Sequence, residues 1–200
     1  MSDVSFVVTL YNKAKYIPAL TNSIFLQKNL GDCEYIFIDD GSTDDTLSIL
    51  EQCTSSHANV KIISQHNAGP SLATNRGIFE ATRPFIKFVD GDEILHPLGT
   101  SELFKAMSML NVEMAFSHGE EIPFTSEKMQ ALNLPLSKRA PTIIDKPLEV
   151  VAKTAIFNLT CLLASAKVIH DMGGCDTKVF IQDYSFALRL ANNTKFAFVP

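Results

Sequence analysis

The stretch 85-FIKFVDGDEILHP-97 decides how the rest of the chain is interpreted. An apolar run with strand-like composition leads directly into Asp90 and Asp92, which are separated by Gly91, and Glu93 follows at once. Neighbouring carboxylates repel one another and lose hydration when they are buried. Such a cluster is therefore either a solvated turn, for which Asp-Gly is a strong signal, or a site that holds a cation.

Strand-like and helix-like segments alternate through the first 110 residues. The predicted strands cover 5–9, 34–39, 60–64 and 85–89, and the predicted helices cover 15–26, 44–53, 70–81 and 97–110. Strands that are joined through helices run parallel, and short strands that are almost wholly apolar are typical of a sheet covered on both faces. The sequence therefore predicts an α/β fold with a mixed, mostly parallel sheet flanked by helices on both faces. Ser42 or Thr43 is the expected N-cap of the second helix.

The pattern is looser after residue 110. It predicts strands over 112–117, 158–164 and 196–199, helices over 147–157, 167–172 and 183–191, and a loop-rich region with a short helix over 119–147. A chain of 200 residues with 46% hydrophobic composition is long enough for one domain with a sizeable core. The chain ends directly after its last predicted strand, at Pro200, which indicates a fold truncated at its C-terminus.

Composition limits the class of partner. The net charge is −5 and the Lys and Arg residues are scattered, which argues against a nucleic-acid-binding protein. The N-terminal sequence MSDVSFVVTLYN lacks the basic region and long apolar core of a signal peptide. No apolar stretch approaches the roughly 20 residues that span a bilayer. We therefore expect a cytoplasmic protein with no transmembrane segment in this chain, associated with a membrane only through another molecule.

Polar residues gather where each of the first four predicted strands ends. In open α/β sheets, ligands bind beyond the carboxyl ends of the strands. Tyr11 offers a flat face for a nucleobase, and Asp39 can accept a hydrogen bond from a base N–H group. The four clusters are Thr9–Asn12, Asp39–Ser42, Asn67–Gly69 and Asp90–Asp92.

Phosphate held through a metal is the chemistry that fits these clusters. The chain contains neither GxxxxGK[ST] nor GxGxxG, so it lacks the two common backbone cradles for phosphate. An acidic crevice would repel a bare diphosphate, but a divalent cation such as Mn²⁺ or Mg²⁺ resolves the conflict. Asp90 and Asp92, with flexible Gly91 between them, can turn toward one ion.

These segments together resemble a family 2 glycosyltransferase with the GT-A fold. The likeness extends from about residue 4 to 200, with a gap over roughly 115–155, and FVDGDEILHP falls on the family's DxD motif. The combination of DDGSTD with a strand-ending DGD is specific, whereas either alone is modest. The segments that carry the resemblance are VSFVVTLYNKAKYI, IFIDDGSTDDT, NAGPSLATNRGI, FVDGDEILHP, MGGCD and IQDYSFALRLA.

The resemblance implies a function for each part of the chain. Residues 1–110 would form the nucleotide-binding half of a single GT-A domain, and residues 111–200 the acceptor half. The reaction would move a sugar from a nucleotide-diphosphate donor, most simply a UDP-sugar, to a hydroxyl of a saccharide or lipid-linked acceptor with inversion. The residues implied are Thr9, Tyr11, Asp39, Asp90 and Gly91 for the nucleotide, Asp90 and Asp92 for the metal, and Asp183 as the general base.

Two positions depart from the family pattern. Thr74 stands where the family carries an arginine, so Arg76 is the candidate cation for the nucleotide, although two residues along a helix place it on a different face. Gln182 stands where the family carries a glutamate. These departures keep open a non-catalytic nucleotide-sugar-binding domain, and a phosphohydrolase with Asp90 as nucleophile is a third alternative. The alternative for Tyr11 is a core or rim aromatic, although its position favours stacking on a base. Without the resemblance, Asp183 would be interpreted equally well as a helix cap.

Overall fold

The computed structural model describes residues 2–121, 135–154, 158–179 and 181–200. The first half contains β1 (Val4–Leu10), α1 (Ile17–Phe25), β2 (Cys33–Asp39), α2 (Thr46–Thr54), β3 (Val60–Ser64), α3 (Pro70–Glu80), β4 (Phe85–Asp90) and α4 (Gly99–Leu110). The second half contains β5 (Met114–Ser117), β6 (Thr142–Ile144), α6 (Pro147–Val151), the 3₁₀ turn η1 (Leu159–Cys161), β7 (Leu162–Ser165), α7 (Ala166–Asp171), α8 (Gln182–Asn193) and β8 (Phe196–Val199).

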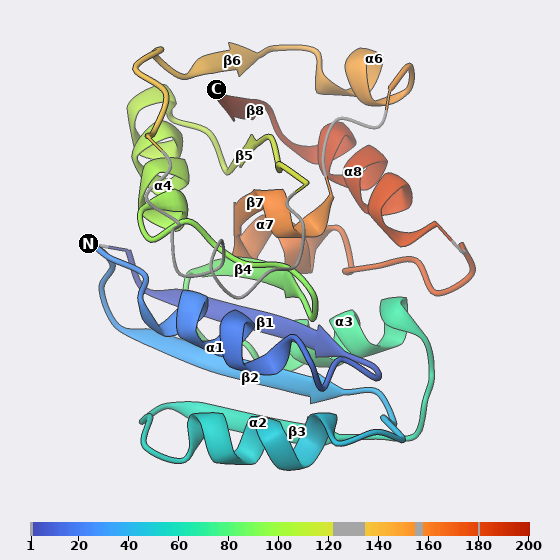
Figure 1. Cartoon of the computed structure of the whole chain (residues 1–200). Helices are drawn as coiled ribbons and strands as arrows, with labels where there is room; N and C mark the ends of the chain where they lie inside the picture. The colour runs from blue at the N-terminus through green and yellow to red at the C-terminus, as the bar shows by residue number, and fades with distance from the viewer. Residues whose placement is uncertain (1, 122–134, 155–157, 180) are drawn as a thin grey trace.

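The strands form one eight-stranded sheet in the order β3-β2-β1-β4-β7-β5-β8-β6 (Figure 1). The pairs within β3-β2-β1-β4 are parallel, as is the β5-β8 pair, whereas β7 and β6 run antiparallel to their neighbours. The predicted mixed, mostly parallel α/β sheet is confirmed. Because β7 runs antiparallel to both β4 and β5, the strands β4, β5 and β8 all run in the same direction. Their carboxyl ends therefore lie at the same edge of the sheet.

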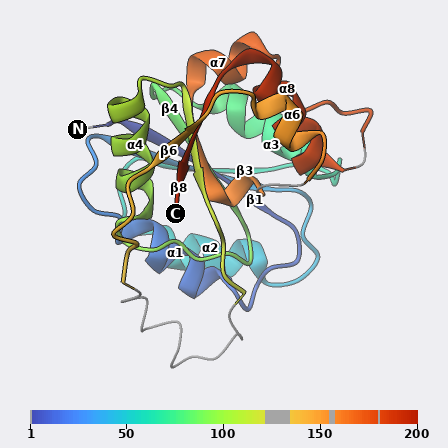
Figure 2. The ribbon, with the colours of Figure 1, turned by 90° about the horizontal axis from the view of Figure 1, so that it is seen from above.

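Two hydrophobic cores lie on opposite faces of the sheet, because successive strand residues point to opposite sides. One core joins α3, α6, α7 and α8 to the sheet, and the other joins α1, α2 and α4 to it (Figure 2). In α1 the apolar residues Ile17, Leu20 and Ile24 recur at helical spacing and are fully buried. Among the described residues, no helix combines the length and apolar composition needed to cross a membrane.

Several predictions for the second half are wrong in detail. The predicted strand over 158–164 is η1 followed by β7, because the Asn158 side chain accepts a hydrogen bond from the Cys161 backbone N–H and closes a turn there. The predicted helix over 147–157 ends at Val151, and its last three predicted residues lie outside the described part. The short helix expected somewhere within 119–147 stays a prediction, because residues 122–134 of that region lie outside the described part. The edge strand β6 was not predicted.

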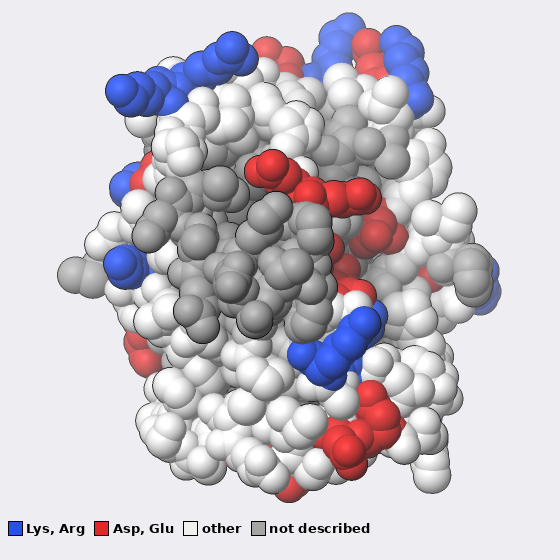
Figure 3. Space-filling view, viewed as in Figure 1, with Lys and Arg blue, Asp and Glu red and all other residues white. Residues whose placement is uncertain are grey.

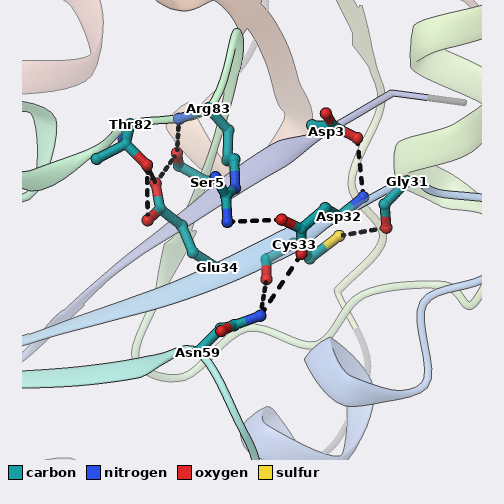
Figure 4. A network of polar contacts seen from close by, with 9 residues as sticks. All are labelled: Asp3, Ser5, Gly31, Asp32, Cys33, Glu34, Asn59, Thr82 and Arg83. Atoms are coloured by element: carbon teal, nitrogen blue, oxygen red, sulfur yellow. Dashed lines mark hydrogen bonds and ion pairs between the residues drawn. The ribbon is translucent and has the colours of Figure 1, made fainter.

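A polar network fastens the amino-terminal edge of the sheet, opposite the ends that carry the candidate site (Figure 4). Glu34 at the start of β2 accepts hydrogen bonds from the Ser5 hydroxyl and the Thr82 backbone N–H, both at 2.6 Å. Arg83 donates its backbone N–H to Ser5 at 3.0 Å and pairs with Asp32 at 2.7 Å. These contacts join β1, β2 and the residues that lead into β4.

Candidate functional site

Strand register brings the predicted site residues to one edge of the sheet. Thr9 on β1 lies opposite Asp90 on β4, and the next residue, Leu10, lies opposite Asp39 on β2. Asp39 is in turn opposite Ser64 on β3. The carboxyl ends of four adjacent parallel strands therefore present Thr9, Asp39 and Asp90 side by side, at the edge where α/β sheets bind ligands.

The loops after β1 and β2 are fastened to each other. The Asn12 backbone N–H donates to the Ser42 hydroxyl at 3.0 Å, and the Thr43 backbone N–H donates to the Asn12 side chain at 2.8 Å. The prediction that Ser42 or Thr43 caps the second helix is wrong, because both residues contact the β1 loop and α2 begins at Thr46 with no side-chain cap. These two loops therefore form one rigid wall of the site.

The two adjacent acids after β2 have different surroundings. Asp40 accepts hydrogen bonds from the Gln65 side chain and from the backbone N–H groups of Ala68 and Gly69, at 2.8 to 2.9 Å. Asp40 therefore holds the loop between β3 and α3. Asp39 is 2% exposed and accepts longer bonds, of 3.2 and 3.3 Å, from the Ser64 hydroxyl and a loop backbone N–H. Its carboxylate keeps the greater acceptor capacity of the two.

Tyr11 and Arg76 occupy different environments. Tyr11 follows β1 at the ligand edge and is 47% exposed, so its ring is accessible to a flat ligand. Arg76 pairs with Glu80 at 2.8 Å along α3, and Glu80 also pairs with Lys61 on β3. Arg76 therefore belongs to a surface ion network of α3 and β3. Among the described residues, no hydrogen bond or ion pair joins it to Asp39 or Asp90.

Gly91 is required by the packing of the DGD turn. A Cβ atom at this position would lie 2.9 Å from a Leu10 methyl, 3.1 Å from the Thr9 carbonyl oxygen and 2.7 Å from the Lys13 side chain. The turn is closed by the Glu93 backbone N–H, which donates to the Asp90 carbonyl at 3.0 Å. A side chain at position 91 would therefore push the two aspartates away from β1.

Negative charge concentrates around Asp90. Burial, together with the charges of Asp183, Glu93 and Asp92, raises the pKa of Asp90 to about 6, and Lys13 opposes this change. Burial and the charge of Asp92 also raise the pKa of Glu93. Acidic side chains gather across the middle of this face of the molecule, with basic side chains directly below them (Figure 3). A bound cation would relieve this repulsion.

The donor set at the DGD turn fits a cation that is shared with a phosphate ligand. Asp92 is partly exposed and pairs with the Lys13 ammonium at 2.5 Å, so a metal ion would compete with that ammonium for the same carboxylate. Within the described residues there is no group of three or more His, Cys, Asp or Glu side chains arranged to hold a metal. Two carboxylates completed by phosphate oxygens are, however, a normal environment for Mg²⁺ at nucleotide sites.

Asp183 lies in the first turn of α8 and faces the same region. Its carboxylate accepts a hydrogen bond from the Leu159 backbone N–H at 3.3 Å, and α8 has no side-chain cap, so the structure does not use Asp183 as a helix cap. Burial raises the pKa of Asp183, which the hydrogen bond from Leu159 opposes. A partly buried carboxyl group whose pKa is raised suits proton transfer.

The two positions that depart from the family pattern contact each other. The Gln182 side-chain amide donates to the Thr74 hydroxyl at 2.7 Å, and Thr74 is buried. The neighbouring Asn75 side chain exchanges two hydrogen bonds with the Cys175 backbone, at 2.7 and 3.0 Å. A neutral polar seam therefore joins α3 to the start of α8, directly beside Asp183.

Sequence reasoning missed a buried group beneath the DGD turn. Lys87 on β4 is 2% exposed, and its ammonium donates to the carbonyl oxygen of Thr160 on η1. Burial lowers the pKa of Lys87 to about 8, although the nearby Cys161, Asp90 and Glu93 oppose this. The available signal was the single charge inside an apolar strand, FIKFV. Lys87, Glu93 and Thr160 line a cavity of about 980 Å³ that opens beside the turn.

Comparisons with known proteins agree with this architecture. The family model described as glycosyl transferase family 2 matches residues 5–137. Escherichia coli chondroitin synthase is 38% identical over 94 residues, which are 47% of this chain and 14% of that protein. The chain thus spans only a small part of that curated relative.

Two solved structures share the fold. Staphylococcal (S. aureus) TarS in complex with UDP superposes with a TM-score of 0.79 at 20% identity, covering 98% of this chain and 57% of TarS. A Pyrobaculum calidifontis mannosyltransferase in complex with GDP-Man and Mn²⁺ gives a TM-score of 0.75 at 19% identity, covering 98% of this chain and 54% of the other. The predicted GT-A fold is confirmed by these neighbours.

Proposed function

The chain belongs to glycosyl transferase family 2, and from this premise we propose that it transfers a sugar from a nucleotide-diphosphate donor to a hydroxyl acceptor. We assign a UDP-sugar as donor, a saccharide or lipid-linked hydroxyl as acceptor, and inversion at the anomeric carbon. The observation that carries the proposal is that consecutive residues of η1 contact both acidic segments: the Leu159 N–H donates to the Asp183 carboxylate, and the Thr160 hydroxyl accepts from the Asp90 backbone N–H.

The nucleotide lies along the carboxyl ends of β1, β2 and β4 in this proposal. The exposed ring of Tyr11 stacks on the base, Asp39 accepts from a base N–H group, and Thr9 lines the same edge. Gly91 lets the DGD turn approach β1 closely, so that Asp90 and Asp92 would hold Mn²⁺ or Mg²⁺ against the diphosphate. When bound, such an ion stabilises the charge that develops on the departing nucleotide diphosphate.

Asp183 acts as the general base. Inverting transfer needs a carboxylate that accepts the proton of the acceptor hydroxyl while that oxygen attacks from the face opposite the leaving group. Asp183 is partly buried and fixed by the Leu159 N–H group, which limits its orientations. The cavity of about 980 Å³ beside the turn has room for an acceptor saccharide unit.

Calorimetric titration with UDP, with and without Mn²⁺, tests the donor site. We expect Mn²⁺-dependent binding that Asp92→Ala abolishes and that Asp145→Asn, a change at an exposed acid paired with Lys195, leaves intact. Binding that is insensitive to Asp92→Ala would contradict the proposed metal site. Arg76→Met belongs in the same series, since a loss of UDP affinity would add Arg76 to the nucleotide site despite its pairing with Glu80.

Hydrolysis of the donor separates an enzyme from a binding-only domain. We expect slow release of sugar from a UDP-sugar by the wild-type chain and a loss of at least a hundredfold in Asp183→Asn, with unchanged UDP affinity. UDP binding without any sugar release would favour the non-catalytic alternative. Release of phosphate from simple phosphate esters would instead favour a phosphohydrolase.

A further inference from the structure

The short turn η1 contacts both acids of the proposed site through consecutive residues. The backbone N–H of Asp90 donates to the Thr160 hydroxyl at 3.0 Å. One residue earlier, the Leu159 backbone N–H donates to the Asp183 carboxylate at 3.3 Å. The end of β4 and the start of α8, which are far apart in sequence, are therefore both attached to one turn.

The turn itself is fixed from two sides. The Asn158 side chain caps it by accepting from the Cys161 N–H at 3.0 Å. The buried ammonium of Lys87 donates to the Thr160 carbonyl oxygen from below. Thr160 thus accepts two hydrogen bonds from β4, one at its hydroxyl and one at its carbonyl, and it is 6% exposed. A hydrogen bond from a charged donor in a buried setting is among the stronger polar contacts in a protein.

An apolar contact also joins β4 to α8 in this region. The rings of Phe88 and Phe186 meet edge to face with centroids 5.4 Å apart. Such packing holds two elements together, but it specifies the direction of neighbouring polar groups less tightly than hydrogen bonds do. Catalytic groups need placement to about half an ångström, and a misplacement of about 1 Å can reduce a rate a hundredfold.

We propose that η1 is a positioning element, with Thr160 as its positioning residue, that sets the separation between Asp90 and Asp183. The expected effect on catalysis rests on the proposed function, in which Asp90 helps to hold the metal and the nucleotide and Asp183 is the general base. Thr160 touches neither substrate nor metal in this scheme. It acts through the backbone of Asp90 and, through Leu159, on the carboxylate of Asp183.

Three variants of the full chain test the proposal. Thr160→Val keeps the side-chain shape and removes the hydroxyl, whereas Thr160→Ser keeps the hydroxyl. Asn158→Ala removes the side chain that accepts the Cys161 N–H hydrogen bond and caps the turn. A matched control is Thr54→Val, which removes an equally buried hydroxyl that bonds the Leu50 carbonyl in α2 at 2.9 Å.

For donor turnover we expect kcat to fall tenfold to a hundredfold in Thr160→Val and Asn158→Ala, while KM for the donor changes less than threefold. Thr160→Ser should lie within threefold of wild type, and Thr54→Val should lose stability without losing kcat. Wild-type kcat in Thr160→Val, or a Thr160→Ser variant as slow as Thr160→Val, would overturn the proposal.

Hydrogen exchange measured by NMR tests the coupling without any turnover. The Asp90 and Leu159 amides should both exchange at least tenfold faster in Thr160→Val than in wild type, and both should recover in Thr160→Ser. If hydrogen exchange in Thr160→Val became faster at the Asp90 amide while the Leu159 amide stayed fully protected, the turn would not couple the two acids. If the wild-type chain releases no sugar, the proposed function fails while this measurement still decides whether η1 joins the two segments.

Discussion

At the scale of single residues, the charge of Asp90 is unfavourable to the fold. Its side chain accepts no hydrogen bond from the described residues, and burial and neighbouring acids raise its pKa to about 6. Its ordinary value of 3.8 applies to the unfolded chain. The folded protein therefore binds more protons between pH 3.8 and about 6, and the free energy of unfolding falls as the pH rises through that range. A local loss of folding stability of this kind is typical of functional sites.

Asp90→Asn should therefore stabilise the ion-free protein at pH 7 while abolishing Mn²⁺-dependent UDP binding. We expect a gain of about 1–2 kcal/mol in the free energy of unfolding at pH 7, and little difference near pH 4, where the wild-type carboxyl is protonated. Urea unfolding at the two pH values measures it. Asp92→Asn is the control, because Asp92 is more exposed and already paired with Lys13. Lower stability of Asp90→Asn at pH 7 would contradict the electrostatic explanation.

Gly91 is constrained by its neighbours rather than by its backbone angles. Gly91→Ala places a methyl group within 2.9 Å of Leu10 and 3.1 Å of the Thr9 carbonyl, so the DGD turn must move. We expect UDP affinity in the presence of Mn²⁺ to fall at least tenfold, as measured by calorimetry. Gly99→Ala is the matched control, because its added Cβ would meet only His96 at 3.7 Å. Equal losses in both variants would show that the effect is not specific to the turn.

At the scale of elements, the segments that could be predicted from the sequence are those whose buried residues form a regular apolar pattern. The strands β1, β2 and β4 are short and apolar, and the helices between them repeat apolar residues every three or four positions, so both were predicted from the sequence. The strand β6, Thr-Ile-Ile, has only three residues, which is too short for an alternating pattern to be recognised in the sequence. The turn η1 was mistaken for a strand because its residues lead without a break into the apolar strand β7. The Asn158 side chain instead closes a turn before that strand begins.

In the candidate site, likewise, some features could be predicted from local sequence patterns and others could not. The strand-end positions of Thr9, Asp39 and Asp90 could be predicted, because parallel strands end at one edge. The ion pair of Arg76 with Glu80 and the hydrogen bond of Gln182 to Thr74 depend on how α3 and α8 pack, which local pattern does not encode. Sequence likeness identified Gln182 and Thr74 as separate departures, and only the fold shows that they are partners.

The Thr74–Gln182 contact should therefore behave as a coupled pair. We expect Thr74→Val and Gln182→Met each to destabilise the chain by about 1 kcal/mol, because each leaves a partly or fully buried polar partner without its hydrogen bond. The double variant should cost less than the sum of the two, with a coupling free energy of about 0.5–1.5 kcal/mol in a double-mutant cycle. Urea unfolding of the four proteins measures it. Strict additivity would show that the 2.7 Å contact contributes nothing.

At the scale of the whole molecule, the acids of the DGD turn and the acid Glu34 at the opposite edge of the parallel sheet differ in the direction of their pKa changes. The carboxyl edge collects acids whose pKa values are raised, such as Asp90 and Glu93. At the amino edge, burial also tends to raise the pKa of Glu34, but hydrogen bonds from Ser5 and Thr82 outweigh it and lower the pKa. Asp90 and Glu93 thus reduce the stability of the ion-free fold where ligands are expected, whereas Glu34 stabilises it where the strands are fastened together.

Glu34→Gln should accordingly reduce stability at neutral pH and have little effect in acid. The folded-state pKa of Glu34 lies below its unfolded value, so its contribution is present above the unfolded pKa and is lost as the pH falls through the folded pKa. The loss at pH 7 should be roughly 1 kcal/mol, since the group is partly exposed and solvent screens it. Thermal unfolding at pH 7 and pH 3 measures this difference, with Glu149→Gln on α6 as an exposed control. Because the network lies at the edge away from the site, UDP affinity should stay unchanged, and a loss of UDP binding in Glu34→Gln would show that the two edges are coupled.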